Sequence, residues 1–138
     1  MGNSTSEIKK ANFDDIINIF KDSAKKTRVL IHVMDAENQE LLIKGTLSIN
    51  EEIEKMNSLL HSGKMDATIV IYGKNTDDVS KLIRRYKQLH DMGFSNVYVY
   101  LGGLFEWLLL QEIYGNEEIQ TNIVCKKNIL DYKPARGL

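Results

Sequence analysis

The ten residues from Ile69 to Asp78 are where this sequence could most readily carry chemistry. Its first four residues, Ile-Val-Ile-Tyr, favour a strand, and the run ends abruptly in the polar hexapeptide Gly-Lys-Asn-Thr-Asp-Asp before a helical pattern begins. Strand-to-helix junctions in α/β proteins often hold a functional site, because free backbone N–H groups meet there at a crevice. The hexapeptide contains no cysteine, serine or histidine. The junction is therefore well placed for chemistry but lacks an evident nucleophile.

The sequence offers few other reactive groups. The single cysteine, Cys125, stands in Ile-Val-Cys-Lys-Lys, outside the hexapeptide, and we interpret it as a packed or incidental residue. His32, His61 and His90 have no metal-ligand spacing with cysteine or carboxylate residues. His32 lies within an apolar run, where a histidine is usually a hydrogen-bonded core residue. We accordingly predict neither a metal site nor a cofactor.

The N-terminal hexapeptide Met-Gly-Asn-Ser-Thr-Ser fits the acceptor pattern for N-myristoylation, in which Gly2 becomes the first residue after removal of Met1. We predict that Gly2 is modified if the source is a eukaryote or infects one; the alternative is an unmodified, disordered tail. A single myristoyl chain binds membranes weakly and reversibly. The predicted membrane association is therefore a weak tether.

Composition limits the classes of protein to consider. The chain has 138 residues, enough for one domain with a core of its own. Its 18 basic and 19 acidic side chains give a net charge of −1, so no general attraction to nucleic acid is expected. One cysteine excludes an internal disulfide framework, and no apolar run approaches the roughly 20 residues that span a bilayer. We expect a soluble cytoplasmic protein.

Strands and helices alternate along the chain, and they must position the hexapeptide. Apolar residues at helical spacing indicate helices, and short apolar runs indicate buried strands. The predicted helices cover about 12–26, 50–62, 76–92 and 104–113, and the predicted strands cover 28–34, 67–72 and 97–100, with short extended pieces in 41–49. Because the connections between strands have the length of helices, the sequence predicts an α/β fold with a mostly parallel central sheet and helices on both faces.

We divide the chain into three parts. Residues 1–11 form a flexible N-terminal segment with the lipidation site, residues 12–115 form the folded domain, and residues 116–138 form a C-terminal extension. The only proline, Pro134, lies in that extension, which we expect to be only partly ordered.

Three segments resemble a single rhodanese-homology domain, in the order that this family shows. They are Ile43–Ile49 with its glycine-containing turn, Thr68–Asp78 with the strand and hexapeptide, and Gly93–Trp107, which contains Gly-Phe-Ser-Asn-Val, Gly-Gly and a tryptophan. With the helices between them they cover roughly residues 12–115. The resemblance implies a three-layer α/β domain. In active members a cysteine persulfide transfers sulfur, and in relatives a cysteine thiolate hydrolyses phosphate esters.

The resemblance also implies where the reactive group should stand. The family places its cysteine first in a six-residue Cys-x-x-x-x-Arg loop directly after the strand. In this chain glycine replaces that cysteine and aspartate replaces that arginine. Glycine has no side chain with which to accept sulfur, and the two aspartates would repel an anionic substrate, with the lysine as a partial counterweight. The degenerate active-site loop consists of Gly73, Lys74, Asn75, Thr76, Asp77 and Asp78.

The loop residues also have a purely structural interpretation. Asn75 or Thr76 can cap the following helix, and Asp77 and Asp78 suit its first turn, where carboxylates interact favourably with the helix dipole. We favour this interpretation over a retained ligand-binding loop.

The predicted helix over 104–113 has an unusually wide apolar arc, with only Glu106, Gln111 and Glu112 polar. One explanation is burial between the sheet and the tail; the other is contact with a protein partner or a second copy of the chain, which would make a homodimer. The interface candidates are Leu104, Phe105, Trp107, Leu108 and Leu109.

These observations predict a catalytically inactive rhodanese-like domain that acts as a protein-binding or regulatory module, reversibly tethered to a membrane through Gly2. The alternative is a sulfurtransferase or a phosphatase-related enzyme with a non-standard nucleophile, for which Cys125 is the only thiol. A third alternative is a structural subunit assembled through the apolar helix. The sequence does not identify the protein partner.

Overall fold

The structure, a computed structural model, describes residues 8–21, 27–35, 40–123 and 128–135 of the chain. Two residues singled out by the sequence, Gly2 and Cys125, lie outside these ranges. The predictions made for them therefore stay predictions.

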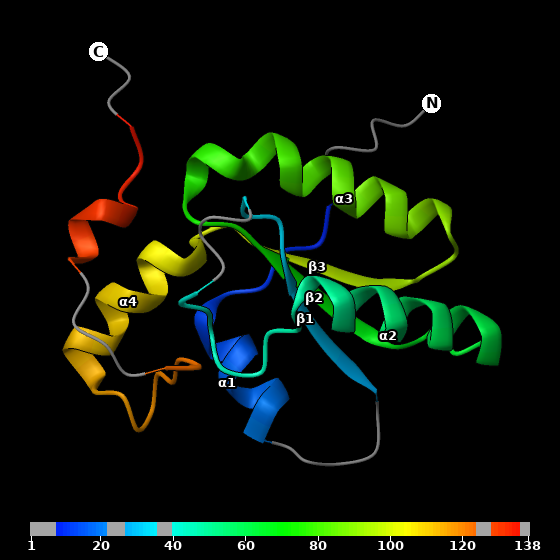
Figure 1. Ribbon diagram of the computed structural model, residues 1–138, viewed down its shortest axis with the longest axis horizontal. Coiled ribbons are helices and arrows are strands. Elements are labelled where there is room, and N and C mark those ends of the chain that lie inside the picture. Colours follow the sequence, from blue (N-terminus) through cyan, green and yellow to red (C-terminus); the bar gives the residue numbers. More distant parts are fainter. Residues whose placement is uncertain (1–7, 22–26, 36–39, 124–127, 136–138) are drawn as a thin grey trace.

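The centre of the described structure is a sheet of three parallel strands (Figure 1). The strands are β1 (Arg28–His32), β2 (Thr68–Tyr72) and β3 (Asn96–Tyr100), and they lie in the order β1-β2-β3. Their register places the last residues of the strands, His32, Tyr72 and Tyr100, side by side. The loops that follow these residues therefore share one edge of the sheet, the carboxyl edge.

Helices connect and surround the strands. Within the described ranges they are α1 (Phe13–Lys21), α2 (Ile49–Ser62), the short 3-10 helix η3 (Thr76–Asp78), α3 (Val79–Asp91), α4 (Gly103–Tyr114) and the 3-10 helix η4 (Ile129–Tyr132). In this part of the chain, none of the helices is both long and apolar enough to cross a membrane.

Local side-chain contacts explain the limits of α2. The Ser48 hydroxyl accepts a hydrogen bond from the Glu51 backbone N–H, and the Glu51 carboxylate accepts one from the Ser48 N–H, which together form a capping box. Gly63, with φ of 72°, closes the helix in the left-handed conformation. The prediction that Asn50 begins this helix is wrong by one residue, because the cap that satisfies the first N–H groups is Ser48.

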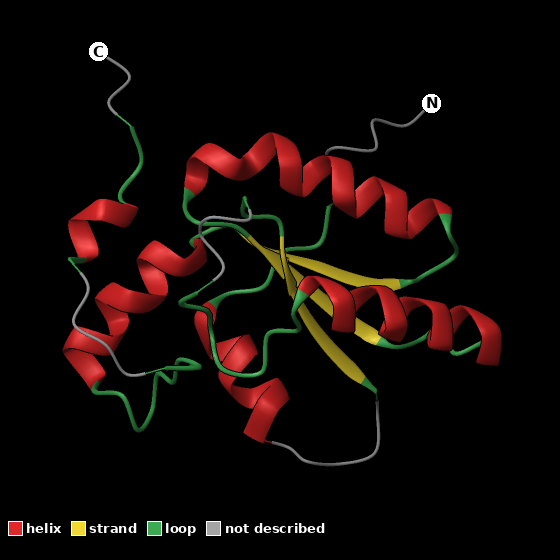
Figure 2. Ribbon diagram, viewed as in Figure 1, coloured by secondary structure: helices red, strands yellow, loops and turns green. Residues whose placement is uncertain are grey.

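Both faces of the sheet are covered by helices (Figure 2). Successive side chains of each strand point to opposite faces, so the apolar strand residues need a layer of helices on each side to be buried. On one face, Val29 and Ile31 of β1 pack in a core with Met56 of α2 and Leu82 of α3. On the other face, the core combines strand residues with α1 and α4 and includes Ile16, Leu30, Val70, Tyr72, Tyr100, Leu104, Trp107 and Leu108. Each fully buried aliphatic side chain stabilises the fold by about 1.5–3 kcal/mol. The predicted α/β architecture, a parallel sheet between two layers of helices, is confirmed.

The two outer strands each gain a further partner at a single bridge. Lys10 forms a parallel bridge with Val99 of β3, and Thr46 forms one with Leu30 of β1. The short extended pieces predicted in 41–49 are reduced to isolated bridges at Ile43 and Thr46 around a turn.

Part of the predicted C-terminal extension belongs to the core. Ile119 is fully buried in the same cluster as α1 and α4. The Trp107 indole N–H donates to the Gln120 carbonyl over 2.8 Å, and the Gln111 side-chain amide donates to the Ile119 carbonyl over 2.8 Å. Residues beyond 115 therefore contribute to the folding of the domain.

Candidate functional site

The hexapeptide loop Gly73–Asp78 connects β2 to α3 at the carboxyl edge of the sheet. Tyr72, which precedes it, is fully buried, and Gly73 is buried as well. The last three residues of the loop form η3, which leads directly into α3. The structure therefore brings all six predicted loop residues together in one strand-to-helix connection.

Asp78 folds back over the start of the loop. One oxygen of its carboxylate, Oδ2, accepts a hydrogen bond from the Lys74 backbone N–H over 2.7 Å. A Cβ atom placed on Gly73 would lie 2.6 Å from both the Cβ and the Oδ2 atom of Asp78. The carboxylate thus fills the space into which a side chain at position 73 would project. A hydrogen bond of this type to a charged group stabilises by about 1.5–3 kcal/mol.

Of the two cap candidates, Asn75 and Thr76, it is Asn75 that caps η3. Its side-chain oxygen accepts a hydrogen bond from the Asp77 backbone N–H over 2.8 Å. Its side-chain amide donates to the Tyr132 carbonyl over 2.7 Å. Only 4% of Asn75 is exposed, so these two bonds satisfy a polar group that burial would otherwise make costly.

The carbonyl groups of the loop face the beginning of α4. The Leu104 N–H donates to the Gly73 carbonyl over 2.9 Å, and the Phe105 N–H donates to the Lys74 carbonyl over 2.8 Å. Gly103 makes this close approach possible, because it has φ of +66° and a Cβ atom there would lie 2.6 Å from the Gly73 carbonyl oxygen. The loop after β2 therefore supplies acceptors for the first N–H groups of α4.

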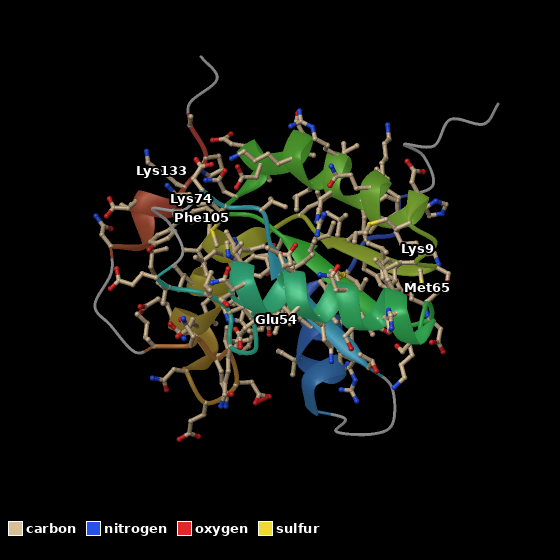
Figure 3. All side chains as sticks on the ribbon, turned by 45° about the vertical axis from the view of Figure 1, so that its right-hand side comes forward. Lys9, Glu54, Met65, Lys74, Phe105 and Lys133 are labelled. Atoms are coloured by element: carbon tan, nitrogen blue, oxygen red, sulfur yellow. The ribbon has the colours of Figure 1, made fainter. Side chains whose placement is uncertain are left out.

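The C-terminal segment completes the surroundings of the loop. The Ala135 N–H donates to the Asp77 carboxylate over 2.8 Å, and the Lys74 ammonium lies 5.6 Å from the centre of the Tyr132 ring. Figure 3 shows Lys74 beside Lys133 of this segment and Phe105 of α4. Sequence reasoning missed these contacts, because the two hydrogen bonds use backbone groups of Tyr132 and Ala135 and because Tyr132 is remote from Lys74 in sequence.

An open cavity of about 420 Å³ lies above the loop. The Lys81 ammonium is 3.0 Å from the Asp35 carboxylate and 3.9 Å from Asp78. The hydrogen bond to Asp35 raises the pKa of Lys81. Anions that enter this cavity meet carboxylates as well as ammonium groups. Its lining comprises Met34, Asp35, Lys74, Asn75, Asp77, Asp78, Lys81, Lys133 and Ala135.

Two buried phenols near the loop are structural. The Tyr72 hydroxyl accepts from the Ile43 N–H over 3.1 Å and lies 2.7 Å from the Thr46 hydroxyl. The Tyr100 hydroxyl donates to the Glu106 carboxylate over 2.6 Å. Burial raises the pKa of both phenols, and for Tyr100 the hydrogen bond to Glu106 raises it further. Both hydroxyls therefore stay protonated at neutral pH and are poor nucleophiles.

Only one of the two ring nitrogens of His32, at the end of β1, forms a hydrogen bond within the described structure. Its Nδ1 accepts a hydrogen bond from the Met34 N–H over 3.1 Å, but its buried Nε2 has no hydrogen-bond partner within the described structure. Burial lowers the pKa of the imidazole. The interpretation of His32 as a core residue is correct, whereas the expectation that its polar atoms are all hydrogen-bonded is wrong for Nε2. The described residues also include no cluster of His, Cys, Asp or Glu placed to hold a metal ion.

The interface candidates on α4 separate into two groups. Leu104, Trp107 and Leu108 are buried in the core, because they face the sheet. Phe105 is half-buried and Leu109 is exposed. The wide apolar arc is thus explained largely by packing, and the prediction of an interface now depends on Leu109 and its exposed neighbours.

Comparison with known proteins supports the same fold. The sequence matches the rhodanese-like domain family over residues 17–110. No curated protein matches the chain. A crystal structure of a protein from Anabaena sp. is similar, with a TM-score of 0.55 and 17% identity, covering 72% of this chain and 86% of that chain. The Rhodanese_3-like domain of the same Anabaena protein has a TM-score of 0.49 and 21% identity, covering 70% of this chain and 100% of that chain.

Proposed function

The chain belongs to the rhodanese-like domain family, and we propose that it is a catalytically inactive member that acts as a protein-binding or regulatory module. The family match covers the loop after β2, where the resemblance places a catalytic cysteine and an arginine. This chain has Gly73 and Asp78 at those positions.

The observation that carries the proposal is the position of the Asp78 carboxylate. It accepts the Lys74 N–H and fills the space beside Gly73. A persulfide mechanism needs a thiolate to accept sulfur and a cation to hold the anionic donor. The chain has no thiol at position 73 and a carboxylate where the resemblance places the arginine, and that carboxylate fills the space beside Gly73.

The direct test is an assay of thiosulfate:cyanide sulfurtransferase and aryl-phosphatase turnover by the purified protein. We expect no turnover above background. Gly73→Cys should remain nearly inactive, because the new side chain meets Asp78 and because Asp78, and not an arginine, stands at the sixth position of the loop. Gly73→Cys combined with Asp78→Arg should give a detectable persulfide after treatment with thiosulfate, measured by mass spectrometry as the addition of one sulfur atom.

The competing function is an enzyme that uses Cys125 as its nucleophile. It predicts turnover by the unaltered protein that disappears in Cys125→Ser. That result would contradict the proposed inactivity and assign the reaction to Cys125, whereas turnover that survives in Cys125→Ser would exclude Cys125 as the nucleophile.

The proposal includes weak tethering to a membrane through a myristoyl group on Gly2, supported by the N-terminal acceptor pattern. We expect the natively expressed protein to carry the mass of one myristoyl group and to partition partly into membranes, since one chain binds reversibly. Gly2→Ala should release it from the membrane fraction. An unmodified native N-terminus would contradict this part of the proposal and leave the binding role unaffected.

A further inference from the structure

The described C-terminal segment, 128–135, runs along the hexapeptide loop in the way that a bound peptide would. Lys133 and Ala135 of the segment line the cavity above the loop together with Lys74 and Asn75, and Figure 3 shows Lys74 beside Lys133. The segment is remote from the loop in sequence, so its position depends on the contacts that the two make.

Two hydrogen bonds hold the backbone of the segment. The buried side-chain amide of Asn75 donates to the Tyr132 carbonyl over 2.7 Å, and the Asp77 carboxylate accepts the Ala135 N–H over 2.8 Å. The loop thus presents a donor, the Asn75 amide, to a peptide carbonyl. It also presents an acceptor, the Asp77 carboxylate, to the peptide N–H three residues later. Every peptide of suitable conformation carries this pair of groups, provided that the later residue is not proline.

Lys133, which lies between these two bonds, has the backbone conformation of a polyproline II helix. Lys133 has φ of −67° and ψ of 153°. Pro134 follows it, and a proline both fixes its own φ and favours this extended conformation in the residue before it. A ligand with proline at the same place would be preorganised for the site and would lose little conformational entropy on binding.

One side chain of the segment is also recognised. The Tyr132 ring lies with its centre 5.6 Å from the Lys74 ammonium, within the range of a cation–π interaction. This contact favours an aromatic residue two positions before the proline. Together with the backbone bonds, it defines the pattern aromatic-x-Pro-x, with a free N–H on the last residue.

The segment is partly buried. Ile129 and Tyr132 pack against the core cluster that includes α1 and α4, whereas Leu130 is 60% exposed. A partner peptide must therefore replace the packing of Tyr132 as well as the two hydrogen bonds. With the segment in place, Asn75 is 4% exposed and its amide donates to the Tyr132 carbonyl. A peptide that replaces the segment would supply an equivalent carbonyl to this donor.

From these contacts we propose that the loop 73–78 is a binding site for extended peptides of the pattern aromatic-x-Pro-x, and that the chain's own residues 132–135 occupy it as a competing ligand. This inference rests on the proposed role as a binding module and names its site and class of ligand. A partner segment binds when it displaces the C-terminal segment.

The test measures binding of a dye-labelled, amidated peptide with the sequence of residues 128–135 to the full-length chain by fluorescence anisotropy. A released chain carries Tyr132→Ala and Ala135→Pro, which remove the aromatic ring and the N–H that the loop recognises. Because a tethered ligand competes at a high effective concentration, the released chain should bind the peptide at least tenfold more tightly than the unaltered chain.

Matched variants of the released chain identify the site. Asn75→Asp retains the oxygen that caps η3 but removes the donor to the peptide carbonyl, and it should weaken binding at least tenfold. Thr76→Ala changes an exposed residue of the same turn and should leave binding unchanged. The labelled peptide with Ala135→Pro should bind weakly to every chain.

The outcomes are distinct. Equal affinity of the unaltered and released chains would overturn the competition, and no saturable binding to a folded released chain would overturn the site. If circular dichroism shows that the released chain is unfolded, the chain with Ala135→Pro alone replaces it. This single variant should bind the labelled peptide at least threefold more tightly than the unaltered chain does. Sulfurtransferase turnover would contradict the proposed inactivity without affecting these titrations.

Discussion

The loops that follow β2 and β3 lie next to each other at the carboxyl edge, and they begin their helices by different means. After β2, the chain uses its own side chains: Asn75 caps η3, and the Asp78 carboxylate accepts the Lys74 N–H. After β3, Gly102 provides no side-chain cap, and the first N–H groups of α4 donate to the carbonyls of Gly73 and Lys74.

The difference shows that one loop serves both connections. The loop after β2 is stabilised by its own polar side chains and in turn supplies the acceptors that α4 lacks. These contacts involve backbone groups and the side chains of Asn75 and Asp78, and none of them requires a side chain at position 73. The shape of the loop can therefore be maintained without a nucleophile there.

The largest effect is expected where the two loops meet. Gly103→Ala forces a non-glycine residue into φ of +66°, which costs roughly 1–2 kcal/mol, and pushes a methyl group against the Gly73 carbonyl oxygen, 2.6 Å away. We expect a loss of about 3 kcal/mol in the free energy of unfolding, measured by urea denaturation, since overpacking typically adds a cost of about 1–3 kcal/mol.

A matched glycine separates the two contributions. Gly63 also has a positive φ, +72°, but a Cβ atom there would meet nothing within 4 Å. Gly63→Ala should therefore cost only about 1 kcal/mol. Equal losses at the two glycines would show that contact between the loops adds nothing.

A second prediction concerns the contact between Gly73 and Asp78. Gly73→Ala should cost about 1–3 kcal/mol because its methyl group meets the Asp78 side chain. In an Asp78→Gly background that contact is absent, so the same substitution should cost at least about 1 kcal/mol less. The control is Thr76→Gly, an exposed position of the same loop; its effect should add to that of Gly73→Ala. If the effects of Gly73→Ala and Asp78→Gly on the free energy of unfolding also added, the contact between a side chain at position 73 and Asp78 would be contradicted.

The end of β1 provides a third comparison, because His32 is buried with one unpartnered nitrogen whereas Asn75 has partners for both ends of its amide. Burial lowers the pKa of His32 below its usual value of 6.5, so the unfolded chain binds the proton more readily. The contribution of neutral His32 to the free energy of unfolding should therefore be fully present above about pH 6.5. This contribution should be lost as the pH falls from 6.5 through the lower pKa that His32 has in the folded protein.

The measurement is the midpoint of urea unfolding at several pH values between 5 and 8. His32→Gln should reduce the loss of stability on acidification in this range. His90→Gln, at an exposed histidine on α3, is the control and should leave the pH profile unchanged. A profile that His32→Gln does not alter would show that another group controls the acid response.

The smallest effect is expected at the rim of the cavity above the loop. Lys81 and Asp35 form an ion pair whose side chains are 43% and 64% exposed, and exposed pairs contribute about 0–1 kcal/mol. Lys81→Gln should therefore change the free energy of unfolding by less than about 0.5 kcal/mol. A loss comparable to that of Gly103→Ala would mean that the rim, and not the contact between loops, determines the shape of the site.

Much of the fold could be predicted because apolar runs such as Ile69–Tyr72 carry a direct signal for buried strands. Asn75 could be identified as a cap because its residue type is favoured where first-turn N–H groups need an acceptor. The direction of the Asp78 side chain could not be predicted, because an aspartate in the first turn can cap the backbone or face solvent. The role of the C-terminal segment was also hidden, since its two hydrogen bonds to the loop involve backbone groups that every residue has.

The apolar helix α4 shows a different limit. Its sequence is apolar on nearly all sides, so the pattern does not distinguish residues that face the sheet, such as Leu104 and Leu108, from an exposed one such as Leu109. The predicted end of the domain at residue 115 followed the extent of the rhodanese-like resemblance, and the buried Ile119 lies beyond it.

The single bridges at the two outer strands bear on the tendency of the protein to aggregate. An outer strand with unpaired N–H and C=O groups is a template on which another chain can add a strand. Here the Lys9 carbonyl accepts the Val99 N–H and the Ala11 N–H donates to the Val99 carbonyl, while the Leu47 N–H donates to Leu30 on the opposite edge. A sheet of only three strands is thereby shielded on both sides by segments too short to be strands themselves, and shortening the chain past Ala11 would uncover β3 to pairing between molecules.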